Sequence, residues 1–167
     1  MTIKTIALAL LTASLSLAAE SLPMSQAETL SGRKLEFPAA LAGKPAVVVF
    51  GFTKEAGDKV KAWMTRLGQE GANAWSVAEL EAAPAFVRGM IRGSMRKDTP
   101  AAFQDHSLIL TKDAKAWKTA VGVKQGNLPV TVLLDSAGQI VWTYEGVFAD
   151  DPYKELTAKL SALQPAK

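Results

Sequence analysis

Along the chain, short apolar runs alternate with amphipathic segments, a pattern typical of an α/β domain. Residues 46–52 read Ala-Val-Val-Val-Phe-Gly-Phe, a run without a charge and rich in β-branched side chains. A strand with one solvated face alternates apolar and polar residues, so this uninterrupted run predicts a central strand buried on both faces. Shorter apolar runs predict two further strands, at residues 74–77 and 107–110.

Two hairpins are also predicted. Ser31 and Gly32 stand between alternating residues in the segment 30–35, which favours a small hairpin at the start of the domain. Residues 127–142 contain an apolar run, the turn sequence Asp-Ser-Ala-Gly and a second run that ends at Trp142. Asp and Gly at these turn positions are typical of a strand, a tight turn and a returning strand.

Four amphipathic segments predict helices, at residues 58–67, 84–97, 113–121 and 152–163. We expect a loop from Thr53 to Gly57 and a cap at Asp58, because a short acidic side chain can accept from the free backbone amides of a helix start. We expect the same of Asp150 and Asp151 before the last helix. These elements predict one domain at residues 30–167.

The amino end has the features of a processing segment. Lys4 supplies a positive charge, residues 6–17 are apolar except for three hydroxyl side chains, and Ser16-Leu17-Ala18 resembles a cleavage site. The apolar stretch is about 12 residues long, against the roughly 20 needed to cross a bilayer, so a permanent membrane helix is the weaker interpretation. We therefore predict a signal peptide at residues 1–19 and a periplasmic or secreted mature protein.

The composition narrows the chemistry. The chain has 167 residues, of which 49% are hydrophobic, with one histidine and no cysteine. It therefore lacks the residues for thiol or disulfide chemistry, for cysteine-ligated metals and for any site that needs two histidines. The 19 Lys and Arg against 16 Asp and Glu are well mixed along the chain, which argues against a nucleic-acid partner. We expect no metal and no cofactor.

The order of a buried strand, a loop, a helix, a later X-Pro hairpin and a closing helix resembles the thioredoxin-like fold. The resemblance covers about residues 30–163, and it implies a three-layer sandwich with a central mixed sheet between helices. Its most specific part is Leu128-Pro129, which stands where that fold keeps a cis-proline. The match rests on the whole order of elements, since a proline before a strand is common.

Redox-active members of this fold carry a Cys-x-x-Cys pair after the first central strand. Alignment on residues 48–50 places Glu55 and Asp58 at the two cysteine positions, with Lys54 just before them. A carboxylate cannot perform thiol–disulfide exchange, although a helix amino end favours an anion. These acids are either a cap and a solvated loop acid, or a recognition site for a cationic partner in a groove beside Leu128 and Pro129.

Residues 50–57 with Ala62-Trp63, and the later segment Ala-Pro-Ala-Phe-Val-Arg-Gly-Met-Ile-Arg, are similar to the mitochondrial ATP synthase assembly-factor family and its bacterial relatives. That resemblance implies a thioredoxin-like protein that often lacks the cysteine pair and acts as a chaperone for a membrane complex. The export signal is a departure from a mitochondrial setting.

The helix at 84–97 is basic on one face. At about 100° per residue, Arg88, Arg92 and Arg96 lie opposite a core-like face, with two glycines between the faces. The core-like face comprises Phe86, Val87, Met90, Ile91 and Ser94. Arginine suits carboxylates and phosphates, so the arginine face is either an ordinary solvated surface or a site for acidic protein segments or lipid head groups.

Two functional hypotheses follow. The first is a redox-inactive binding or assembly factor, chaperone-like, for an envelope protein or a membrane complex. The second is an enzyme of the same fold that uses Glu55, Asp58 or His106 in non-thiol acid/base chemistry, or a member classed with oxidoreductases or antioxidants by family. The single histidine lacks an evident nucleophile to activate, so we assign no catalytic residue and favour the binding protein.

Overall fold

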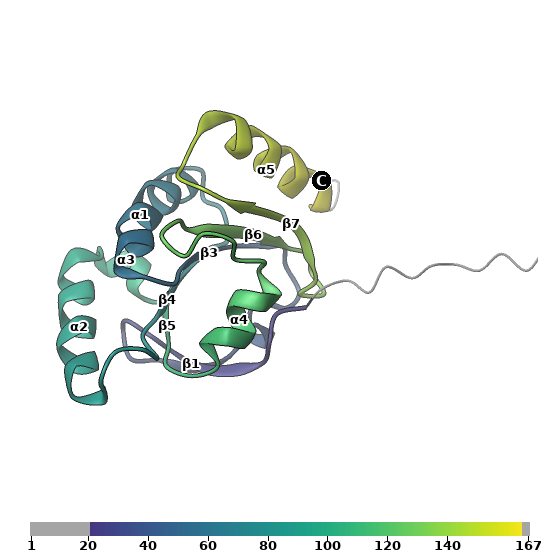
Figure 1. Cartoon of the computed structure of the whole chain (residues 1–167). Helices are drawn as coiled ribbons and strands as arrows, with labels where there is room; N and C mark the ends of the chain where they lie inside the picture. Colours follow the sequence, from purple (N-terminus) through teal and green to yellow (C-terminus); the bar gives the residue numbers. More distant parts are fainter. Residues whose placement is uncertain (1–20, 165–167) are drawn as a thin grey trace, which may run out of the picture.

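The computed structural model describes residues 21–164, so the predicted signal peptide at 1–19 lies outside the described residues. Figure 1 shows helices on either side of a central sheet. In chain order the elements are β1 (Ser25–Thr29), β2 (Lys34–Phe37), the short 3-10 helix η1 (Ala39–Leu41), β3 (Ala46–Gly51), α1 (Lys54–Gln69), β4 (Ala74–Glu79), α2 (Ala85–Asp98), α3 (Ala101–Gln104), β5 (Ser107–Leu110), α4 (Ala114–Ala120), β6 (Val130–Leu134), β7 (Ile140–Glu145) and α5 (Asp150–Leu163).

The sheet has seven strands in the order β2-β1-β5-β4-β3-β6-β7. The three central strands β3, β4 and β5 are parallel, and the strands outside them pair antiparallel. Every residue of β3 is buried, as its uninterrupted apolar run predicted. The mixed α/β class expected from the sequence is thereby confirmed.

Two hydrophobic layers cover the sheet. On one face, Trp117 of α4 stacks on Phe37 with ring centroids 5.3 Å apart. On the other face, Trp63 of α1 and Leu156 of α5 are fully buried against the alternate residues of β3. Figure 1 shows α4 and α5 on opposite sides of the sheet. Burial of each large side chain contributes about 1.5–3 kcal/mol, so both helix layers are firmly attached.

Both predicted hairpins are present. β1 pairs antiparallel with β2 and also with β5, so the sheet begins at Ser25, before the predicted domain start at residue 30. β6 pairs with β7 around a turn in which Asp135 Oδ1 accepts from the amides of Ala137 and Gln139, each at 2.9 Å. This hairpin sets β6 beside β3 and fixes where the preceding loop meets the rest of the fold.

The expected loop at 53–57 is wrong, because α1 begins at Lys54. Thr53 is its cap, with its hydroxyl oxygen accepting from the amide of Ala56 at 3.2 Å. Asp58 lies in the second turn and does not cap. The sequence prediction took Gly57 as a loop residue, whereas two lysine–acid pairs four residues apart span these turns and support the helix.

The expected packing of α2 is only partly correct. None of its residues is buried, and of the face that was expected to pack inward Val87 and Ile91 are half-buried whereas Phe86, Met90 and Ser94 are exposed. Phe86 is 87% exposed and Met90 is 72% exposed. The arginines instead contact the body of the protein, because backbone carbonyls and a carboxylate beside the helix accept their hydrogen bonds.

The last helix starts slightly earlier than predicted. α5 begins at Asp150, with Ala149 in the cap position, and neither Asp150 nor Asp151 makes a capping hydrogen bond through its side chain. Both acids lie in the first turn, where a negative charge is favoured by the helix dipole. Among the helices in residues 21–164, none combines the length and the apolar character needed to cross a membrane.

Candidate functional site

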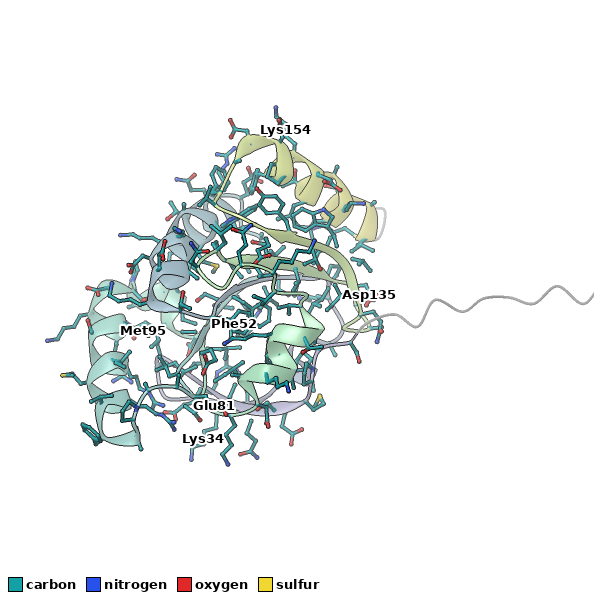
Figure 2. The ribbon with its side chains drawn as sticks, viewed as in Figure 1. Lys34, Phe52, Glu81, Met95, Asp135 and Lys154 are labelled. Carbon is teal, nitrogen blue, oxygen red and sulfur yellow. The ribbon has the colours of Figure 1, made fainter. Side chains whose placement is uncertain are left out.

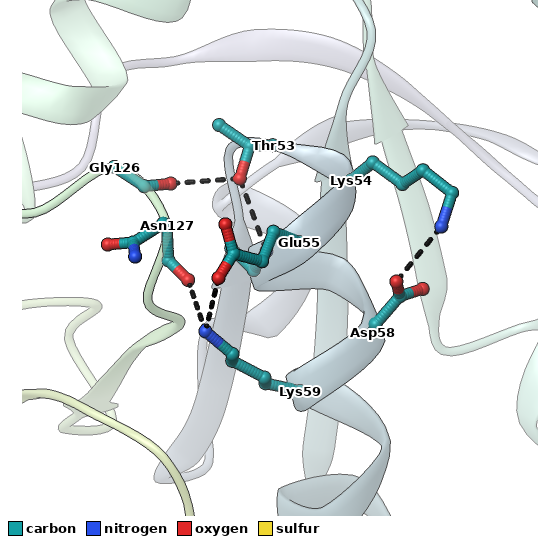
Figure 3. Close-up of polar contacts among 8 residues, drawn as sticks. Thr53, Lys54, Glu55, Asp58, Lys59, Gly126 and Asn127 are labelled. Atoms are coloured by element: carbon teal, nitrogen blue, oxygen red, sulfur yellow. Dashed lines mark hydrogen bonds and ion pairs between the residues drawn. The ribbon is translucent and has the colours of Figure 1, made fainter.

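The amino end of α1 lies against the loop at 124–129, as Figure 3 shows. Thr53 holds the two together. Its hydroxyl donates to the carbonyl of Gly126 at 3.0 Å while its oxygen accepts from the amide of Ala56. One side chain therefore starts the helix and fixes the loop, so the two segments form one surface.

Lys59 makes a second bridge between the same segments. Its ammonium donates to Glu55 Oε1 and to the carbonyl of Asn127, both at 3.0 Å. In Figure 3, Glu55 and Lys59 face the loop, whereas Lys54 and Asp58 form a separate pair at 3.0 Å on the other side of the helix. The two predicted acids are thus both ion-paired, but only Glu55 is connected to the loop.

The loop is also held from the opposite side. The carboxylate of Glu145 accepts from the amides of Lys124 and Gln125, at 2.9 and 2.6 Å. Gly126 and Asn127 stay exposed, Leu128 is half-buried and Pro129 is buried. Of the predicted groove residues, Leu128 therefore offers part of its surface to a partner, and Pro129 supports the loop from beneath.

The expectation of a cis-proline at Pro129 is wrong. Within residues 21–164 the cis peptide bond is Phe37–Pro38, and the Leu128–Pro129 bond is trans. Trans is the ordinary state of an X-Pro bond, so the loop needs no special isomer. The carbonyl of Pro129 accepts from the amide of Gly146 at 3.0 Å, which joins the loop to the end of β7.

Gly51 allows α1 to start close to the end of β3. A Cβ atom placed on Gly51 would lie 2.9 Å from the Cα atom of Gly57, closer than two carbon atoms can approach. The same addition at Gly57 meets nothing within 4 Å. The glycine in the strand is therefore required by the close approach of the helix, which brings Glu55 and Lys59 to the loop.

A shallow hollow of about 470 Å³ adjoins this surface on the α4 side. The lining residues are Glu81, Ala114, Lys115, Lys118, Thr119 and Val123. The Lys118 ammonium lies 5.7 Å from the ring centroid of Phe52, the residue before Thr53. No carboxylate of residues 21–164 forms an ion pair with Lys118, so this half-buried cation is open to an external anion.

This surface presents charged groups and hydrogen-bonding groups to solvent. The chain has no cysteine, and Glu55 and Asp58 each have a lysine as counter-ion. The residues described by the structure contain no cluster of three or more side chains suited to a metal ion. His106 packs against Trp75 with ring centroids 4.6 Å apart, on other elements.

The three predicted arginines do not belong to this surface. Arg88 donates to the carbonyls of Ala83 and Glu81, Arg92 forms a 2.6 Å ion pair with Glu28, and Arg96 donates to the carbonyl of Leu30. They attach α2 to β1 and to the segment before the helix. Each arginine therefore contacts its own chain, with Arg88 and Arg92 half-buried and Arg96 exposed.

Sequence reasoning missed four residues that build the site. These are Thr53, Lys59, Lys118 and Asn127. A signal for Lys59 was present, since it stands four residues after Glu55, a spacing that pairs charges on a helix. Nothing in the sequence marked Asn127, which takes part through its backbone carbonyl.

Solved structures with the same architecture exist at low sequence identity. BsSco, a member of the Sco family of cytochrome c oxidase assembly proteins, is 13% identical with a TM-score of 0.60, and the match covers 87% of this chain and 94% of that chain. Yeast Sco1 is 17% identical, with a TM-score of 0.59 and coverage of 89% and 99%. The exposed lipoprotein thioredoxin of Streptococcus pneumoniae is 13% identical, with a TM-score of 0.58 and coverage of 84% and 100%.

These matches place the chain in the thioredoxin-like fold, which confirms the fold predicted from the order of elements. At identities of 13–17% the likeness concerns the fold alone. No protein-family model and no curated protein matches the chain. Its function is therefore argued from its own residues.

Proposed function

We propose that this protein is an exported, redox-inactive binding protein of thioredoxin-like fold that assists the assembly of a protein or complex in the cell envelope. It binds its partner at the joined surface of the α1 amino end and the 124–129 loop. The observation that carries the proposal is the pair of lysine–acid contacts at the amino end of α1 in a chain without cysteine. Glu55 and Asp58, which the sequence alignment sets at the cysteine positions of redox-active members, are each paired with a lysine.

This surface suits recognition because it is fixed before a partner arrives. Thr53 and Lys59 join the helix to the loop, and Glu145 holds the loop from behind. A preorganised surface loses little conformational entropy on binding, which favours affinity. Gly126 and Asn127 lie at its exposed centre.

The charges on this surface indicate the partner's chemistry. Lys118 has no counter-ion within the described part of the chain, and Lys115 lines the same hollow. An acidic side chain of a protein partner would pair with Lys118 over the Phe52 ring, in a partly desolvated position where charge pairs are strong. Although each is paired with a lysine, the side chains of Glu55 and Asp58 are 62% and 67% exposed, so their carboxylates can also contact a neighbouring cationic group of the partner.

The comparisons support an assembly role by analogy. BsSco is a member of a family of cytochrome c oxidase assembly proteins, and the pneumococcal neighbour is an exposed lipoprotein. The sequence resemblance to ATP synthase assembly factors indicates the same class of role, with a membrane complex as the partner. The processing segment at residues 1–19 supports a periplasmic or secreted location.

Site-specific photo-crosslinking in intact cells tests the proposal. A photoreactive residue replaces Asn127 at the site and, as the matched control, Ala158 on the exposed side of α5. We expect a discrete protein adduct from position 127 alone, identified by mass spectrometry. We also expect Lys118→Glu to reduce that adduct several-fold and Lys154→Glu to leave it unchanged.

The control lysine is well separated from the site. Figure 2 shows Lys154 on α5, at the other end of the molecule from Glu81, which lines the hollow. Equal adducts from positions 127 and 158, or an adduct that resists Lys118→Glu, would contradict the proposed surface. The chain has no cysteine, so we expect no disulfide reductase or peroxidase turnover from the purified protein. Such turnover would contradict its redox-inactive character.

A further inference from the structure

Glu81, in the turn between β4 and α2, is held at three points. Its backbone amide donates to the carboxylate of Glu79, and its backbone carbonyl accepts from the Arg88 guanidinium at 2.9 Å. Its side-chain carboxylate accepts from the amide of Ala114, the first residue of α4, at 2.6 Å. Figure 2 shows Glu81 between α2 and α4. One exposed residue therefore connects the amino ends of two helices that are far apart in the sequence.

The amino end of α4 depends on this contact. The first amides of a helix have no acceptor within the helix, and a side chain at the cap position usually supplies one. Asp113 holds that position in α4 but makes no capping hydrogen bond, and its φ of 62° is left-handed. Glu81 supplies the acceptor from another element. The first turn of α4 is therefore held by Glu81 as well as by its own backbone.

Arg88 fixes the backbone that carries Glu81. Its Nε atom donates to the carbonyl of Ala83 at 2.8 Å, and a terminal nitrogen donates to the carbonyl of Glu81 at 2.9 Å. A planar guanidinium that donates to two carbonyls fixes their relative position, which a flexible ammonium does less well. No residue of α2 is buried, so polar contacts of this kind hold much of its amino end. The position of Glu81 therefore depends on Arg88.

We propose that Glu81 is a positioning residue of the partner site, through which Arg88 of α2 sets the first turn of α4 and thereby the placement of Lys118. Lys118 lies about one turn after Ala114 on this short helix, and it lines the same hollow as Glu81. When Arg88 releases the turn, Glu81 loses its place and the first turn of α4 loosens. The Lys118 ammonium is then no longer held over the Phe52 ring. The role of this coupling rests on the function proposed above, whereas the coupling itself is a property of the free protein.

Hydrogen exchange measured by nuclear magnetic resonance on the purified protein tests the coupling. Arg88→Met removes both contacts with the turn. It should accelerate exchange of the Ala114 amide by about threefold or more, because that amide loses a well-placed acceptor. Arg96→Met is the matched control, since it removes the same charge from the same helix and a contact with the carbonyl of Leu30, outside the turn. It should leave exchange at Ala114 unchanged.

A double-mutant cycle separates positioning from general destabilisation. Glu81→Ala removes the acceptor, so it should accelerate exchange at Ala114 at least as much as Arg88→Met does. Glu81→Gln keeps a side-chain oxygen in the same place and should restore most of the protection. In the Glu81→Ala background, Arg88→Met should have no further effect on Ala114, because the connection between the two residues is already gone.

The partner site gives a second readout. Arg88→Met should reduce the photo-crosslinked adduct at position 127 by about twofold or more, because Lys118 is less well placed for an acidic group, whereas Arg96→Met should leave the adduct unchanged. An adduct missing from the unaltered protein would contradict the proposed function, and hydrogen exchange would still decide the coupling.

Four results would overturn the proposal. The first is an effect of Arg88→Met on exchange that is confined to α2. The second is equal acceleration at Ala114 by Arg88→Met and Arg96→Met, which would show a general loosening of α2. The third is an undiminished effect of Arg88→Met in the Glu81→Ala background. The fourth is an adduct that stays unchanged in Arg88→Met although exchange at Ala114 rises.

Discussion

Lys59 links α1 to the 124–129 loop, so its replacement is the sharpest perturbation of the candidate site. In Lys59→Met the chain loses the contacts to Glu55 and to the carbonyl of Asn127 but keeps most of the aliphatic stem. Lys54→Met is a matched control on the same helix. It removes one ion pair, to Asp58, and no contact with the loop.

The expected magnitudes differ because the surroundings differ. Each i,i+4 pair contributes about 0.2–0.5 kcal/mol. A hydrogen bond from a charged group adds about 1.5–3 kcal/mol when shielded and less at a surface. Lys59 is 30% exposed and Lys54 is 91% exposed. We therefore expect Lys59→Met to lower the free energy of unfolding by about 1–2 kcal/mol, and Lys54→Met by about 0.5 kcal/mol or less.

Urea unfolding measures the global effect, and hydrogen exchange of the amides at 124–128 measures the local one. Lys59→Met should accelerate exchange in this loop, because one of its anchors is gone, whereas Lys54→Met should not. Equal losses of stability in the two variants, or unchanged loop exchange in Lys59→Met, would refute the view that Lys59 joins the helix and the loop into one surface.

Three further predictions concern the scaffold. Gly51→Ala should lower the free energy of unfolding by about 1–3 kcal/mol, because it forces a Cβ atom onto Gly57. Gly57→Ala should raise it by about 0.5–1 kcal/mol. Urea titrations in which Gly51→Ala is the more stable of the two variants would refute this packing. Thr131 Oγ1 is buried without a hydrogen-bond partner among the described residues. Thr131→Val should therefore raise the free energy of unfolding by about 1 kcal/mol and the melting temperature with it, and a lower melting temperature would show that the hydroxyl has a partner. Burial, helped by Glu70, raises the pKa of Tyr153 from 10.0 to about 12. Its contribution to the free energy of unfolding is therefore complete below pH 10 and is lost as the pH rises from 10 to 12, by up to about 2.7 kcal/mol. Tyr153→Phe should remove that part of the alkaline loss in unfolding measured at each pH, and an unchanged slope would contradict it.

The fold could be predicted from the sequence where local pattern and burial agree. The uninterrupted run of β3 identified a central strand, and the Asp-x-x-Gly turn at Asp135 identified the hairpin that follows. Prediction failed at the start of α1, because a glycine at position 57 suggests a loop. In the structure Gly57 lies in the helix and packs closely against Gly51 at the end of β3. That contact depends on tertiary packing and has no local signature.

The candidate site was only partly predictable, for a similar reason. Side-chain chemistry pointed to Glu55 and Asp58, but the partners that organise the site include the backbone carbonyls of Gly126 and Asn127. Such acceptors exist at every position, so a sequence does not reveal which are used. The same limit explains α2. Its helical period was correct, but carbonyl acceptors such as that of Leu30 bind the arginines to the chain and leave Phe86 and Met90 exposed.

The central claim is that the α1 amino end and the 124–129 loop bind a protein partner. The most direct measurement is hydrogen exchange by mass spectrometry on the intact protein, alone and with the partner captured at position 127. The account predicts slower exchange in peptides that cover residues 53–60 and 124–129, and no change in α5. Protection confined to other elements, with these two segments exchanging as in the free protein, would contradict it.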